Sequence, residues 1–76
     1  MPRITPIYWK SVEKVFLAAG FRLARQEGRH RSYTKPGILR PVVIPTYDEV
    51  PVAIIKKNLQ TASISRDEYF RLLESM

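Results

Sequence analysis

The residue with the clearest chemical potential is His30, the single histidine of this 76-residue chain. Imidazole gains and loses a proton near neutral pH, so it can serve as a catalytic base or acid. Gly28 marks a turn just before it, and Arg29 and Arg31 flank it directly. RNA cleavage without a metal needs this combination, since a base deprotonates the ribose 2′-hydroxyl and cations stabilise charge at phosphorus. A lone histidine is also a common surface residue, and spacing alone leaves both interpretations open.

Positive charge is concentrated around this histidine. The formal net charge is +6, and the stretch from Arg22 to Arg40 holds six basic residues and one acid, Glu27. Such a cluster attracts polyanions, although a basic surface can also serve only to keep a small protein in solution. Lys56 and Lys57 could reach phosphate or could form the solvent face of a helix. The candidate RNA-binding residues are Arg22, Arg25, Arg29, Arg31, Ser32, Lys35, Lys56 and Lys57.

Several classes of function are disfavoured by composition. The chain has no cysteine, which removes thiolate metal sites, disulfides and a cysteine nucleophile. The acidic pairs Asp48-Glu49 and Asp67-Glu68 do not make the convergent carboxylate set of a magnesium nuclease. No apolar run approaches the length of a membrane span, and the N-terminus does not resemble a signal peptide. We therefore expect a soluble, cytoplasmic protein that needs no metal, no small-molecule cofactor and no membrane.

The elements that must position these residues follow from periodicity and turn signals. Apolar residues at intervals of three and four predict a helix over 8–19, closed by Gly20. Alternating segments at 21–26, 29–35 and 39–44 predict three strands, the last interrupted by Pro41 and therefore at an edge or bulged. Two further helices are predicted, one from Pro51 to Ala62 and one starting at Ser65 with a capping box.

This order, α-β-β-β-α-α, predicts an α+β fold. The short connections between strands indicate a three-stranded antiparallel sheet with helices on one face, as in double-stranded-RNA-binding domains. We expect residues 1–76 to form a single domain of this kind. The other face of the sheet, left open by the helices, is where we expect the functional residues.

Strand alternation predicts which side chains share that open face. Tyr33 is the largest apolar residue of the second strand and is expected to point inward, which turns His30 and Ser32 outward. The remaining assignments are Phe21, Leu23, Val42 and Ile44 inward, and Arg22, Ala24, Gln26, Thr34 and Val43 outward.

Five ordered segments resemble the HicA (YcfA-like) family of toxin–antitoxin modules. They are Ala19-Gly20-Phe21, the run from Arg25 to Tyr33, Val42-Val43-Ile44-Pro45, the helix from Ile54 to Leu59, and Ile64-Ser65-Arg66-Asp67-Glu68-Tyr69. The resemblance covers most of the chain, from Trp9 to Leu73. It implies a fold like a double-stranded-RNA-binding domain, cleavage of mRNA that depends on His30, and neutralisation by a HicB-type antitoxin.

The chain also departs from that family pattern. Arg29 stands where many members have serine, and Tyr47-Asp48-Glu49 stands where many have a second histidine or a basic run. Three functions therefore remain open: a ribonuclease toxin, an RNA-binding module without activity, and a domain whose open face binds only an antitoxin.

Overall fold

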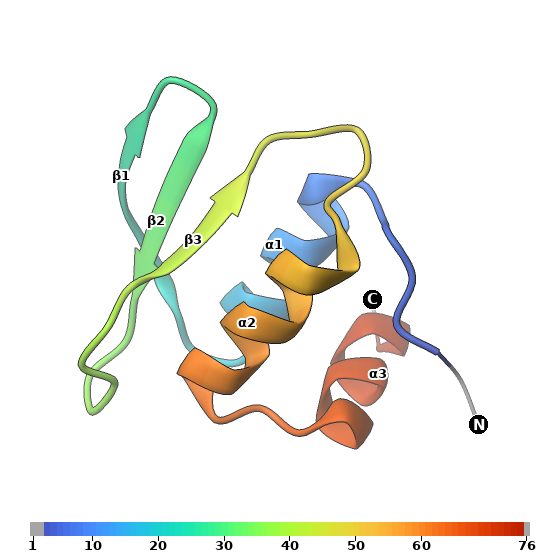
Figure 1. Ribbon diagram of the computed structural model, residues 1–76. Coiled ribbons are helices and arrows are strands. Elements are labelled where there is room, and N and C mark those ends of the chain that lie inside the picture. The colour runs from blue at the N-terminus through green and yellow to red at the C-terminus, as the bar shows by residue number, and fades with distance from the viewer. Residues whose placement is uncertain (1–2, 76) are drawn as a thin grey trace.

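The computed structural model describes residues 3–75 and confirms the predicted element order. Three antiparallel strands form a sheet in the order β1-β2-β3, and the three helices lie to one side of it (Figure 1). The elements are α1 (Trp9–Ala18), β1 (Arg22–Glu27), β2 (His30–Thr34), β3 (Val42–Pro45), α2 (Val52–Ala62) and α3 (Arg66–Glu74). None of the helices in residues 3–75 has the length and apolar character needed to cross a membrane.

Local signals end and begin the helices as the sequence predicts. After α1, Gly20 adopts φ +100°, and the amide of Phe21 donates to the carbonyl of Phe16 at 2.9 Å. This arrangement satisfies carbonyl groups that the end of a helix leaves without partners. Before α3, the hydroxyl of Ser65 accepts a hydrogen bond from the amide of Glu68 at 3.1 Å, as expected of an N-cap.

The third strand is shorter than predicted. It starts at Val42 instead of Leu39, and Pro41 lies just before it. Proline has no amide hydrogen to donate to a neighbouring strand, so the strand begins after it.

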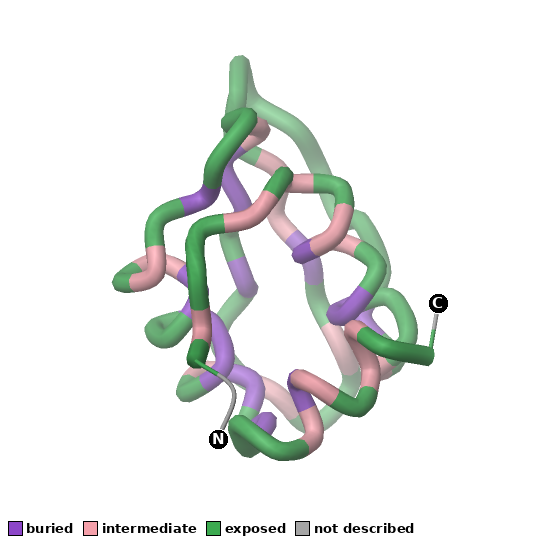
Figure 2. Tube along the Cα trace, turned by 90° about the vertical axis from the view of Figure 1, so that its right-hand side faces the viewer, coloured by how far each residue is buried: buried purple, intermediate pink, exposed green. Residues whose placement is uncertain are grey.

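The hydrophobic core lies between the sheet and the helices. Figure 2 shows that buried positions recur along the chain, separated by exposed and intermediate ones. The fully buried side chains are Tyr33, Val42 and Ile44 from the sheet, Val12, Val15 and Phe16 from α1, Val50 from the segment before α2, Ile55 from α2, and Tyr69 from α3. Tyr33, Val42 and Ile44 point inward as predicted, which leaves the opposite face of the strands without a helix over it.

The helices cover the sheet unevenly. Helix α2 packs beside β3, where the side-chain amide of Asn58 donates to the carbonyl of Val43 at 2.9 Å. Strand β1 packs chiefly against β2, and all six of its residues are exposed. Leu23 lies on the same side of the sheet as Tyr33, yet it is 43% exposed because no helix covers it. The hairpin of β1 and β2 therefore projects from the helical layer.

Candidate functional site

Strand pairing defines the open face of the sheet, because residues directly opposite each other in an antiparallel pair point to the same side. His30 lies opposite Glu27 on β1 and opposite Pro45 on β3. One row away, Ser32 lies between Arg25 and Val43. The open face thus consists of Arg22, Arg25, Glu27, His30, Ser32, Thr34, Val43 and Pro45. As predicted, His30 and Ser32 share it, and the His30 side chain is exposed.

A bulge in β1 changes one predicted orientation. The register shifts between Leu23 and Arg25, so Ala24 is an extra residue in this strand. Beyond the bulge the alternation reverses, and Arg25 lies opposite Ser32 while Gln26 lies opposite Arg31. The prediction that Gln26 points outward was therefore wrong. Its place on the open face is taken by Arg25, which forms an exposed ion pair with Glu27 at 3.2 Å.

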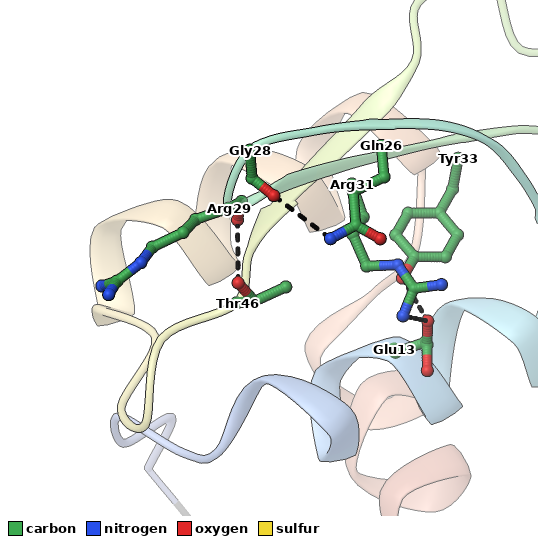
Figure 3. A network of polar contacts seen from close by, with 7 residues as sticks. All are labelled: Glu13, Gln26, Gly28, Arg29, Arg31, Tyr33 and Thr46. Carbon is green, nitrogen blue, oxygen red and sulfur yellow. Dashed lines mark hydrogen bonds and ion pairs between the residues drawn. The ribbon is translucent and has the colours of Figure 1, made fainter.

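A two-residue turn holds His30 at the end of the hairpin. Gly28 adopts φ +58° whereas Arg29 does not have a positive φ, a pattern that suits a turn with glycine at its first central position. The backbone carbonyl of Arg29 then accepts two hydrogen bonds from Thr46, from the amide at 2.7 Å and from the hydroxyl at 3.2 Å (Figure 3). The turn that presents His30 is thereby tied to the segment that follows β3.

Tyr47 contacts His30 from that segment. The two rings are in an edge-to-face arrangement, with centroids 6.4 Å apart and planes at 69°. Tyr47 is 37% exposed, so its ring is partly covered and still accessible from solvent. Tyr47 is not among the site residues predicted from the sequence, although it stands where many HicA family members have a second histidine that it could replace. The contact depends on the pairing of Pro45 with His30 between β3 and β2, which the spacing of residues within either strand does not reveal.

Arg31 lies on the opposite side of the sheet from His30. Its guanidinium group forms an ion pair with Glu13 of α1 at 3.2 Å and lies 5.2 Å from the centroid of the Trp9 ring. The hydroxyl of Tyr33 also donates to the Glu13 carboxylate (Figure 3). Burial and the hydrogen bond to Glu13 raise the pKa of Tyr33 well above its usual value. Arg31 thus joins β2 to α1 beneath the site and does not extend the open face.

Lys35 is also held by the fold. Its ammonium group donates to the carbonyl of Ala19 at 2.7 Å and lies 5.7 Å from the centroid of the Phe21 ring. A cation at the C-terminal end of α1 is favourable because that end of a helix carries partial negative charge.

The remaining candidate cations are divided between two regions. Arg22 lies on the open face opposite Thr34, and Arg29 is exposed in the turn. Lys57 lies beside the open face, where it lines a hollow of about 290 Å³ between β3 and α2. Lys56, one residue away, lines a different hollow formed with Arg3, Ile4 and Ile64. The structure therefore places Arg22, Arg25 and Ser32 on the same face of the sheet as His30, with Arg29 in the adjoining turn and Lys57 beside β3. Arg22 lies at the far end of the hairpin from His30, and Lys56 lies in a separate region.

No group of three or more metal-binding side chains converges anywhere in residues 3–75. On and beside the open face lie an imidazole, a phenol, hydroxyl groups, guanidinium groups, the ammonium group of Lys57 and the carboxylate of Glu27. Such groups can transfer protons and stabilise a phosphate.

Residues 9–64 match the family model described as the HicA toxin of bacterial toxin–antitoxin systems. This segment is more than half of the chain and includes the sheet, its open face, α1 and α2. No curated protein shows significant similarity to the chain. This match confirms the resemblance to the HicA family that the five sequence segments indicate. The chain belongs to the HicA toxin family, and it is accordingly the toxin of a toxin–antitoxin pair with a cognate antitoxin as its partner.

Proposed function

We propose that this toxin is an endoribonuclease that cleaves mRNA with His30 as its general base and without a metal cofactor. The observation that supports this most directly is the position of His30, which is exposed on the face of the sheet that also carries Arg22 and Arg25, directly after Arg29 in the turn. An mRNA substrate implies action in the cytoplasm.

The proposed reaction uses the ribose itself as the nucleophile. A neutral His30 imidazole takes the proton of the 2′-hydroxyl, and the 2′-oxygen attacks the adjacent phosphorus. The P–O5′ bond breaks, and the leaving 5′-oxygen takes up a proton, so that the products are a 2′,3′-cyclic phosphate and a 5′-hydroxyl. Guanidinium groups next to the phosphate stabilise the charge that develops on its oxygens. Ser32 lies beside His30 on the same strand face and can donate a hydrogen bond to a phosphate oxygen.

The test is cleavage of a fluorescently labelled RNA in the presence of EDTA by the wild type and by His30→Ala. Loss of one general base slows a reaction by about 10²–10⁴-fold. His30 is exposed, so its removal leaves no core cavity and the variant should keep the wild-type circular dichroism spectrum. Lys14→Ala, which removes an exposed cation of α1, is the control and should cleave at the wild-type rate. The mechanism is wrong if folded His30→Ala cuts RNA as fast as the wild type.

Two further readouts identify the chemistry. An RNA with 2′-deoxyribose at the cleaved position should resist the enzyme, because the nucleophile is missing. A DNA oligonucleotide of the same sequence should resist the enzyme for the same reason. RNA binding without any cleavage would instead favour the second candidate function, a non-catalytic RNA-binding module on the same face.

For the antitoxin, we propose a HicB-type protein that covers the open face with acidic residues. A cationic face beside an active histidine would otherwise bind RNA in the cell that makes the toxin. Opposite charges on the two proteins would also speed their association.

A further inference from the structure

The segment 46–49, which carries Tyr47, is fastened to the rest of the molecule at both ends. Thr46 donates two hydrogen bonds to the carbonyl of Arg29, and the carbonyl of Tyr47 accepts one from the amide of Trp9 at 3.2 Å. Beyond it, the amide of Val50 donates to the carbonyl of Ile7 at 2.7 Å. The backbone on either side of the Tyr47 ring is therefore fixed, and so is the backbone of the turn that precedes His30.

This anchoring places a phenol and an imidazole where one substrate could contact both. The two ring centroids are 6.4 Å apart, and each ring is accessible from solvent. Each group can reach a substrate atom by a hydrogen bond of about 2.6–3.2 Å. A phosphodiester bound against the exposed edges of both rings could thus place its 2′-oxygen side near the imidazole and its 5′-oxygen side near the phenol.

We propose that Tyr47 is the second catalytic residue, the general acid that protonates the leaving 5′-oxygen; this rests on the ribonuclease function proposed above. His30 accepts the 2′-hydroxyl proton, the P–O2′ bond forms, the P–O5′ bond breaks, and the Tyr47 phenol gives its proton to the 5′-oxygen. The enzyme is left with an imidazolium and a phenolate. Return of one proton from the first to the second, through water, restores the starting state.

Other side chains near His30 fit this role less well. Glu27 lies directly opposite His30, but its carboxylate forms an ion pair with Arg25 at 3.2 Å, and its side chain is 71% exposed. An ionised carboxylate has no proton to donate. Ser32 and Thr34 carry aliphatic hydroxyl groups, which are much weaker acids than a phenol. A phenol is protonated at neutral pH and can release that proton to an alkoxide as the alkoxide forms.

The decisive experiment varies the leaving group. Tyr47→Phe keeps the ring against His30 and every backbone hydrogen bond of the segment, and removes only the hydroxyl. Its cleavage rate is compared on ordinary RNA and on RNA whose scissile 5′-oxygen is replaced by sulfur, a leaving group that does not need protonation. We expect Tyr47→Phe to be slowed about 10²–10⁴-fold on ordinary RNA. On the sulfur substrate it should approach the wild-type rate, whereas His30→Ala should be slow on both substrates.

The matched control is Tyr8→Phe, which removes the hydroxyl of another exposed tyrosine and should cleave both substrates like the wild type. An equal loss on both substrates by Tyr47→Phe would overturn the proposal, because it would mean that the phenol only positions the site. Wild-type rates for Tyr47→Phe on ordinary RNA would overturn it as well, while leaving the ribonuclease function intact. Failure of that function is a separate result, seen when the wild type cleaves neither substrate.

Discussion

His30 and Arg31 are adjacent in the chain, but their side chains lie on opposite faces of the sheet. His30 is exposed beside Tyr47, while Arg31 contacts Glu13 and the Trp9 ring on the helical side. The side chain of Arg31 is only 21% exposed. Two neighbouring basic residues therefore have different structural roles, and substitutions should separate them.

The first prediction concerns the stability supplied by Arg31. Arg31→Ala should lower the free energy of unfolding by about 1–3 kcal/mol, because it leaves the partly buried Glu13 without its cation. Arg25→Ala is the matched variant, and its removal from an exposed ion pair should change stability by less than about 0.5 kcal/mol. Urea unfolding measures both values. The affinity for RNA should change in the opposite order, and Arg25→Ala should lose more affinity than Arg31→Ala. Equal free energies of unfolding for Arg31→Ala and Arg25→Ala would contradict the role of Arg31 in joining β2 to α1.

The second prediction concerns the salt dependence of RNA binding. If three to five cations around the open face contact phosphates, log Kd should change with log salt concentration by a slope of about 2–3.5 in magnitude. Reversing Arg25 and Lys57 to glutamate should reduce that magnitude by about 1.4 or more, since each lost contact removes about 0.7. The control is the double reversal of Lys14 and Arg71, two exposed cations of α1 and α3. If the control flattens the slope as much, RNA binds elsewhere.

The third prediction concerns stability at alkaline pH. Burial raises the pKa of Tyr33 and of Tyr69, and the hydrogen bond to Glu13 raises that of Tyr33 further. Both groups hold their protons more tightly in the folded state. Their contribution to the free energy of unfolding is thus complete below a pH of about 10, the pKa of tyrosine in the unfolded chain. It is lost as the pH rises toward the pKa values of the folded state. Stability should therefore decline once the pH exceeds about 10.

Tyr33→Phe tests this assignment. It should cost about 1 kcal/mol at neutral pH, because the hydrogen bond to Glu13 is lost. Above about pH 10 its stability should fall less steeply than that of the wild type, since only Tyr69 remains to titrate with a raised pKa. Urea unfolding between about pH 8 and pH 11 measures both slopes. Parallel declines in the two proteins would rule out Tyr33 as a source of the loss.

The fourth prediction concerns the antitoxin. Val43 is 38% exposed on the open face, where it lies on the edge strand β3 and offers apolar contact, as Tyr47 does just beyond that strand. Val43→Lys should weaken the toxin–antitoxin complex by about tenfold or more if the open face is the interface. Leu17→Lys, on an exposed position of α1 across the molecule, should have little effect. Calorimetric titration gives both dissociation constants. An antitoxin complex that still binds RNA on the open face would contradict the proposed mode of inhibition.

The sequence alone determined the helices and their ends, because these depend on residues close together in the chain. The spacing of Val12, Val15 and Phe16 predicts the buried side of α1, and Gly20 and Ser65 mark helix ends through local backbone chemistry. The outward direction of His30 also followed from local information, since it lies three residues from the buried Tyr33 within one strand. These elements, with the turn at Gly28, were sufficient for the α+β fold.

The tertiary structure decided how distant residues meet. The bulge at Ala24 places Arg25 on the open face and turns Gln26 to the other face. The alternation of residues within one strand does not predict this bulge. Arg31 pairs with Glu13 of α1, 18 positions away, and Lys35 bonds to the carbonyl of Ala19 at the end of α1, 16 positions away. Tyr47 reached His30 only because β3 pairs with β2 and Thr46 bonds to Arg29. Each of these contacts depends on strand register and helix packing, which are set by the folded chain as a whole.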